Sequence, residues 1–194
     1  MKSWGGALRD AWWSGALVSV ISTAVLALFG RSESGSAFAP TNAISHWFWG
    51  DRALHQDRPS IRYTLAGYAT HHLASVFWAV FYERWFGAKA ERGDARAAVG
   101  GGLTIAALAC FVDYQMTPRR LQPGYEARLS NQALVGVYGA IAIALAVSSL
   151  TRRGRQPERA SLPWRAHARR MPRHERAFAR PSPGRSLTQK QTVL

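Results

Sequence analysis

The chain has 194 residues, 47% of them hydrophobic, with a formal net charge of +14 and an isoelectric point near 11.3. Such basicity in a soluble domain would point first to nucleic acid, but 12 of the 25 Lys and Arg residues follow Leu150 and so belong to a tail. The single cysteine, Cys110, excludes a disulfide within the chain and a thiolate metal cluster.

The first predicted element is an uncharged apolar segment at residues 11–29. It is long enough to cross a bilayer, because spanning takes about 20 predominantly apolar residues. The later stretch "SAFAP" has the small-residue pattern of a signal-peptidase site. We expect no cleavage, because Pro40 would follow the cut and Asp10 lies in the segment that would have to be basic.

The loop that follows, residues 30–62, contains "APTNAISHWFWGD". This pattern predicts a short interfacial helix at about 42–49, with Ile44, Trp47 and Phe48 on one face. The alternative is a re-entrant turn inside the bundle, where His46 and Asp51 would face the other helices. We prefer the surface helix, because lipid disfavours irregular backbone with unpaired polar groups.

The second predicted span, residues 63–82, carries no formal charge but contains two adjacent histidines. A rise of 1.5 Å per helical residue places this pair roughly 12–14 Å below the outer end of the span. Other polar side chains lie at comparable depth on neighbouring spans. Together they form a predicted middle polar layer of His71, His72, Ser19, Ser22 and Tyr138.

The third predicted span, residues 97–114, has too few apolar residues to cross without taking in Asp113. Asp113 is therefore expected near the membrane boundary. There it would belong to an outer polar layer with Arg62, Asn131 and Gln132. The two layers are separated by about 10 Å along the bundle, which is too far for direct hydrogen bonds.

The fourth predicted span covers residues 129–150, and the composition then changes to an Arg- and Pro-rich tail at 151–194. The tail has no periodic apolar face, so we expect it to be disordered. Its positive charge favours contact with anionic lipid headgroups, worth about 1 kcal/mol per basic residue near the surface. Nucleic acid ranks lower, since no binding motif accompanies the charge.

These elements predict an all-α fold, in which residues 1–150 form an integral-membrane, four-helix antiparallel bundle. Small residues at four-residue spacing, such as Gly15 and Gly102, would let the helices approach closely. Both termini are predicted to be cytoplasmic by the positive-inside rule. That orientation depends on the tail, because the remaining basic residues divide six against seven between the two sides.

Catalytic chemistry finds little support in these patterns. Neighbouring helical residues diverge by about 100°, so His71 and His72 do not chelate one metal, and no other predicted span contains a histidine. Ser19 and His71 could meet, but no acid is placed to orient the imidazole. We therefore predict no catalytic residue, no metal and no cofactor, and we rank a structural polar layer above a proton relay.

Three stretches carry a resemblance to other proteins: "GSAFAPTNAISHWFWGD", "HHLASVFWAVFYERWFG" and "FVDYQMTPRRLQPGYEARLS". Together they resemble a group of small uncharacterised bacterial four-span inner-membrane proteins, some of which carry transporter-like labels. The similarity extends from Trp12 to about Leu150 and leaves out the tail. It implies an architecture and a location in the bacterial inner membrane, but no catalytic residue.

Three hypotheses follow for function. The first is a non-enzymatic accessory or envelope component with the bilayer as its main partner and a homo-oligomer or another membrane protein as a further one. The second is a small proton-coupled transporter or oligomeric channel that uses His71, His72 and Asp113. The third is a redox or metal-dependent membrane enzyme.

Overall fold

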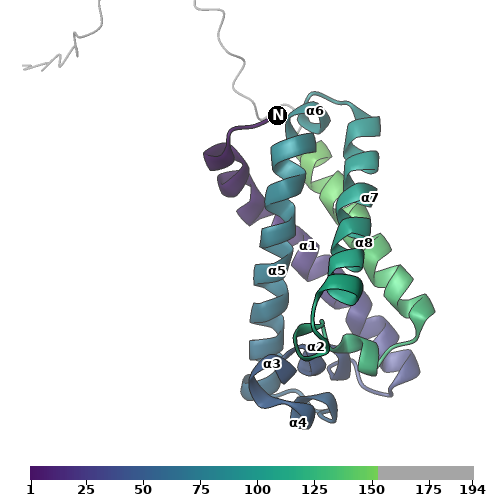
Figure 1. Ribbon diagram of the computed structural model, residues 1–194. Helices are drawn as coiled ribbons and strands as arrows, with labels where there is room; N and C mark the ends of the chain where they lie inside the picture. Colours follow the sequence, from purple (N-terminus) through teal and green to yellow (C-terminus); the bar gives the residue numbers. More distant parts are fainter. Residues whose placement is uncertain (153–194) are drawn as a thin grey trace, which may run out of the picture. The chain divides into compact units, whose positions relative to one another are not determined.

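The computed structural model describes residues 1–152, and all regular elements within this range are helices. The all-α prediction is confirmed for this part of the chain. The predicted tail lies, from residue 153 onward, outside the described residues. Four long helices run along the body (Figure 1): α1 (Trp4–Glu33), α5 (Ala66–Tyr82), α7 (Ala95–Phe111) and α8 (Asn131–Thr151).

Three helices in the described part of the chain are long and apolar enough to cross a membrane. They are Trp4–Glu33, Ala95–Met116 and Asn131–Thr151, the second of which joins α7 to the π-helix η3 (Val112–Met116). The helix over the predicted second span, α5, is present but is not among these three. Its His71 and His72 lower the mean hydropathy of a helix that has only 17 residues.

The starts of three long helices follow from side chains that cap them. Ser3, Asp94 and Ser130 each accept a hydrogen bond from a backbone amide in the first turn of α1, α7 and α8, respectively. Such caps satisfy amides that have no partner within the helix. The boundaries of these helices are therefore set locally by the sequence.

Close backbone approach positions the long helices against one another. α1 packs on α5 and α8, and α7 packs on α8. A Cβ atom added to Gly15 would lie 2.5 Å from the Cα of Val76 on α5, and one on Gly102 would lie 2.4 Å from the carbonyl oxygen of Ala142 on α8. Only glycine fits at these two contacts.

The first loop differs from the predicted interfacial helix at 42–49. It forms α2 (Ala39–Ile44), α3 (His46–Trp49) and α4 (Asp51–Leu54). All six residues of α2 are buried, so the surface-helix prediction is wrong for this segment, whereas Trp47 and Phe48 of α3 are exposed. The physical reason is the buried side chain of Asn42, which bonds to Gln56, Arg58 and Thr64 at this end of the body.

The Asn42 side chain satisfies backbone groups that the loop would otherwise leave unpaired. Its Nδ2 donates to the carbonyl oxygens of Gln56 and Arg58 at 2.9 and 3.0 Å, and its Oδ1 accepts from Thr64 Oγ1 at 2.6 Å. A buried segment is tolerated when its polar groups are paired in this way. The loop therefore closes one end of the body.

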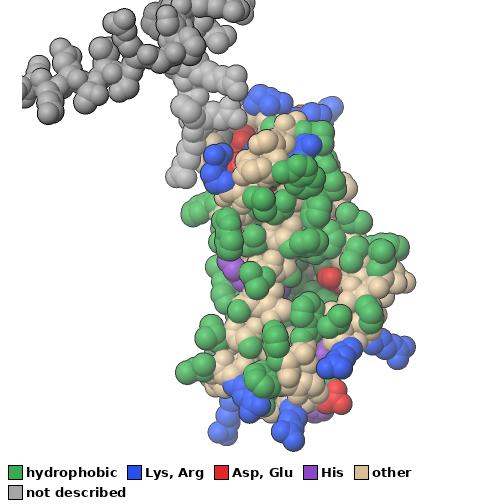
Figure 2. Space-filling model, turned by 60° about the vertical axis from the view of Figure 1, so that its left-hand side comes forward, with side chains coloured by type: hydrophobic (Ala, Val, Ile, Leu, Met, Phe, Trp, Pro, Cys, Tyr) green, Lys and Arg blue, Asp and Glu red, His purple; other side chains and the backbone are tan. Residues whose placement is uncertain are grey.

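Short helical segments complete the two ends of the body. The end that holds α2–α4 also contains the π-helix η1 (Ile61–Leu65) and the 3-10 helices η4 (Arg119–Leu121) and η5 (Tyr125–Ala127). The opposite end holds the N-terminus, the π-helix η2 (Glu83–Gly87) and α6 (Ala88–Glu91) (Figure 1). Figure 2 shows Lys and Arg side chains gathered at both ends, with a mostly hydrophobic surface between them.

Candidate functional site

The two histidines of α5 both contact serines of α1. His71 Nε2 lies 2.7 Å from Ser22 Oγ, and His72 Nδ1 lies 2.9 Å from Ser19 Oγ. Adjacent residues on α5 can reach the same neighbouring helix because the two serines are themselves three positions apart, close to one turn of α1. The structure thus brings together four of the five residues of the predicted middle layer.

The hydrogen on the His71 ring follows from the bonds of its partner. The Ser22 hydroxyl donates its only proton to the carbonyl oxygen of Val18 at 2.7 Å. With the hydroxyl proton on that carbonyl, the hydroxyl oxygen is an acceptor for a hydrogen on His71 Nε2. The contact between the buried imidazole and Ser22 joins α5 to α1.

Tyr138 was predicted in the middle layer and Asp113 in the outer layer, but the two side chains bond to each other. Tyr138 donates its hydroxyl to Asp113 Oδ2 at 2.6 Å, and the Tyr125 hydroxyl donates to Tyr138 Oη at 3.1 Å. The depth estimate located Tyr138 by its backbone and assigned it to the histidines. Its long side chain instead carries the hydroxyl to Asp113.

The other members of the predicted outer layer do not gather around Asp113. Arg62 stacks over the ring of Trp49, with its guanidinium carbon 4.1 Å from the ring centroid. Asn131 and Gln132 are exposed in the first turn of α8. That predicted grouping is corrected, because equal depth does not bring side chains on different faces of different helices into contact.

A cavity of about 90 Å³ lies between the long helices and reaches both predicted layers. His71 and Asp113 both line it, although they do not hydrogen-bond to each other, and so do Tyr125 and Tyr138. The predicted separation of the two layers is therefore incomplete. Water or a small ligand in this space would contact both ionisable groups, since the volume exceeds what one water molecule needs.

The loop candidates His46 and Asp51 lie apart from this cavity. His46 Nδ1 is 2.9 Å from the carbonyl oxygen of Ala43, and its ring packs beside Gly124, whose φ of +91° favours glycine. Asp51 is exposed in α4. Two residues of this loop line the cavity, Ile44 and Trp47, and Trp47 Nε1 donates to the carbonyl oxygen of Gln122 at 2.9 Å.

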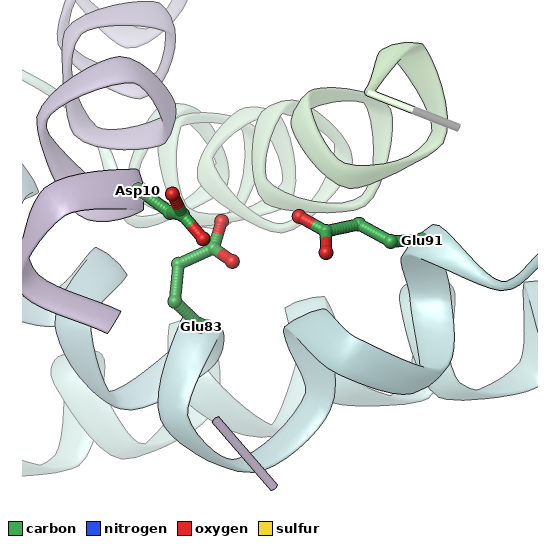
Figure 3. A group of neighbouring side chains, drawn as sticks. All are labelled: Asp10, Glu83 and Glu91. Atoms are coloured by element: carbon green, nitrogen blue, oxygen red, sulfur yellow. The ribbon is translucent and has the colours of Figure 1, made fainter. Parts of the chain in front are cut away.

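A second cluster of charged side chains, missed from the sequence, lies at the opposite end of the body. The carboxylates of Asp10, Glu83 and Glu91 come from α1, η2 and α6 and converge (Figure 3). Lys2 Nζ lies among them, 2.8 Å from Asp10, 2.6 Å from Glu83 and 2.7 Å from Glu91. Arg152, which follows α8, also pairs with Glu83 and Glu91.

The electrostatics of this cluster favour the charged state of its bases. Burial alone would lower the pKa of Lys2, but hydrogen bonds to Asp10, Glu83 and Glu91 outweigh it and raise the pKa above the ordinary 10.5. The pKa of Arg152 is raised for the same reason. Lys2 fills the place that a cation would take among the three carboxylates, so the cluster is a network of ion pairs.

The positions of its charged residues in the sequence could have predicted this cluster. Lys2, Asp10, Glu83 and Glu91 all lie near span ends that were predicted to share one side of the membrane. Glu83 is completely buried and accepts a 2.8 Å hydrogen bond from the Ser14 hydroxyl, so it lies inside the body.

Three polar side chains that join elements lie in π-helices. Each of η1, η2 and η3 contributes one polar residue to a bond between elements: Thr64 to Asn42, Glu83 to Lys2, and Asp113 to Tyr138. A π-turn inserts an extra residue and shifts the helix face that follows it, and such segments are frequent at functional sites. Hydrophobic periodicity does not predict this shift.

Comparisons of the chain with protein-family models, with curated proteins and with solved structures found no match.

Proposed function

We propose that the chain is a multi-pass inner-membrane protein, a non-enzymatic accessory or envelope component built as a four-span antiparallel bundle. In this proposal α5 also crosses the bilayer, as the second of four spans in chain order. Both termini are cytoplasmic, and His71 and His72 form a structural polar layer. The lipid bilayer is the principal partner, with anionic headgroups for the basic tail, and a homo-oligomer or another membrane protein is a further one.

The observation that carries the proposal is an apolar surface shared by all four long helices. Each one exposes large hydrophobic side chains along its middle, and α5 does so as strongly as the others. Examples are Val20 on α1, Leu73 and Phe77 on α5, Leu103 on α7, and Ile143 on α8. In water such a surface would promote aggregation, whereas in lipid it costs nothing.

The structural role of the histidines is supported by the bonds from both rings to α1. Helices in lipid associate through close packing and interhelical hydrogen bonds, because the lipid supplies no hydrophobic drive. Gly15 provides the close approach and Ser19 and Ser22 provide the bonds on the same helix.

Membrane fractionation tests the proposal. After expression of the full chain and extraction of membranes at alkaline pH, the protein should remain in the membrane pellet and require detergent for release. Recovery of folded protein in the aqueous fraction would contradict the proposal.

A second candidate function, a small proton-coupled transporter or oligomeric channel, is favoured by one observation: His71 and Asp113 line the same cavity. Ionisable side chains inside a membrane mark transport paths in many proteins. The test is proton flux in proteoliposomes, measured with a pH-sensitive dye. Flux that is lost in His71→Ala while the variant stays folded would favour this candidate over the accessory role, and the absence of flux would rule it out.

A further inference from the structure

Asp113 is a carboxylic acid at a cavity wall without a basic partner. Among the described residues, the ion pairs involve Asp10, Asp57, Glu83 and Glu91, but not Asp113. Tyr138 donates to its Oδ2, while no protein donor in the described residues reaches its Oδ1. A carboxylate in a low-dielectric site favours a cationic or hydrogen-bond-donating ligand.

Aromatic rings form much of the remaining wall. Trp47, Trp78, Tyr125 and Tyr138 line the cavity together with Asp113. The faces of such rings attract cations, and cages of aromatic rings recognise alkylated ammonium groups. The combination is suited to a positive charge that is spread over an apolar group.

The polar side chains of the cavity wall do not suit a metal ion. Ca²⁺ takes six to eight oxygen ligands and Mg²⁺ demands octahedral oxygen geometry, whereas this cavity presents one carboxylate, the His71 imidazole, hydroxyl groups and a predominance of apolar side chains. Its one imidazole and one carboxylate are also fewer than the three protein ligands of a zinc site. The carboxylate likewise disfavours an anion. An organic cation satisfies both the carboxylate and the rings.

The size of the cavity limits the ligand to a small group. Its volume of about 90 Å³ is below the roughly 150 Å³ of a cavity that accommodates benzene. Trp47 and Leu121, which are 38% and 45% exposed, contribute to the wall, so the cavity meets the surface at the end that holds α2–α4. A ligand would enter there, beside the bond from Trp47 to Gln122.

We propose that this cavity binds a small organic cation, an alkylammonium group about the size of trimethylammonium, with Asp113 as its counter-ion and the four aromatic side chains as its cage. The inference rests on the folded helical body of the proposed function, but it does not require transport.

The test is calorimetric titration of the full chain in detergent with trimethylammonium chloride, compared with tert-butanol, a neutral molecule of similar shape. Wild-type protein should bind the cation and should not bind the alcohol. Equal binding of the two probes, or no binding of the cation, would overturn the proposal.

Two variants locate the site. Asp113→Asn keeps an acceptor for the Tyr138 hydroxyl but removes the charge, and it should weaken trimethylammonium binding by at least about tenfold. The matched control Asp51→Asn removes an exposed acid outside the cavity and should bind like wild type. Unchanged trimethylammonium binding in Asp113→Asn would contradict the role of Asp113 as the counter-ion.

The wild-type comparison of cation with alcohol decides the proposal even if Asp113→Asn does not fold. Membrane insertion is scored separately by alkaline extraction, so failure of binding and failure of the proposed function give different results.

Discussion

At the residue scale, the bond between Ser22 and His71 joins two helices in a buried setting. A double-mutant cycle with Ser22→Ala and His71→Phe should give a coupling energy close to about 0.6 kcal/mol, the average for hydrogen bonds between helices in membranes. It should not exceed about 2 kcal/mol. Thermal unfolding in detergent measures it. The control pair, Ser22→Ala with His72→Phe, should couple less, because His72 bonds to Ser19.

A coupling energy near zero for Ser22 and His71 would mean that the imidazole does not fasten α5 to α1. The structural role of the histidine would then be lost.

Residue types and their depth in the predicted spans were enough to single out His71, His72, Ser19 and Ser22 as neighbours. They were not enough for Tyr138 or Asp113, because depth was counted along the backbone and the tyrosine side chain extends away from it. The Asn42 side chain pairs with Gln56, Arg58 and Thr64, and no sequence pattern indicated this role. A side chain that bonds to several residues distant in sequence leaves no local pattern from which these bonds could be predicted.

At the element scale, the glycines of α7 provide a test of helix packing. Gly102→Ala should destabilise the protein by about 1–3 kcal/mol, since the new methyl group would overlap the backbone of Ala142. Gly100→Ala, two positions away with nothing within 4 Å, is the matched control. It should be neutral or stabilising by up to about 1 kcal/mol. Unfolding in detergent compares the two variants, and equal effects would contradict the packing of α7 on α8.

Element boundaries were predicted well where apolar length and caps agree. The spans expected at 97–114 and 129–150 correspond to Ala95–Met116 and Asn131–Thr151. The first was placed at 11–29, whereas α1 covers Trp4–Glu33. Its extra turns are contacted by residues distant in sequence: Arg152 donates to the carbonyl oxygen of Asp10, and Ser130 donates to Glu33.

At the scale of the whole molecule, Lys2 links the start of the chain to α1, η2 and α6. Lys2→Met would leave Glu83 and Glu91 with Arg152 alone and Asp10 with Arg9 alone. The variant should destabilise the protein by about 3–5 kcal/mol, the usual cost of breaking a buried ion pair. Lys89→Met removes an exposed lysine from α6 and should change stability little. Similar melting temperatures for the two variants would contradict the role of the cluster.

The same cluster predicts a pH dependence. The folded pKa of Lys2 is raised above its ordinary 10.5, so its contribution to stability is complete below pH 10.5 and is lost as the pH rises through the folded pKa. The melting temperature of wild type in detergent should therefore fall more steeply at strongly alkaline pH than that of Lys2→Met. Parallel curves would show that Lys2 does not titrate in the fold.

The central claim is that α5 crosses the bilayer together with α1, α7 and α8, which places the two ends of the body on opposite faces. Cysteine accessibility tests it in a Cys110→Ala background, with single cysteines in place of exposed residues at each end: Arg9 and Lys89 at one, Arg52 and Arg119 at the other. A membrane-impermeant thiol reagent should label Arg9→Cys and Lys89→Cys from one face and Arg52→Cys and Arg119→Cys from the opposite face. Labelling of Arg52→Cys and Lys89→Cys from the same face would contradict the four-span bundle.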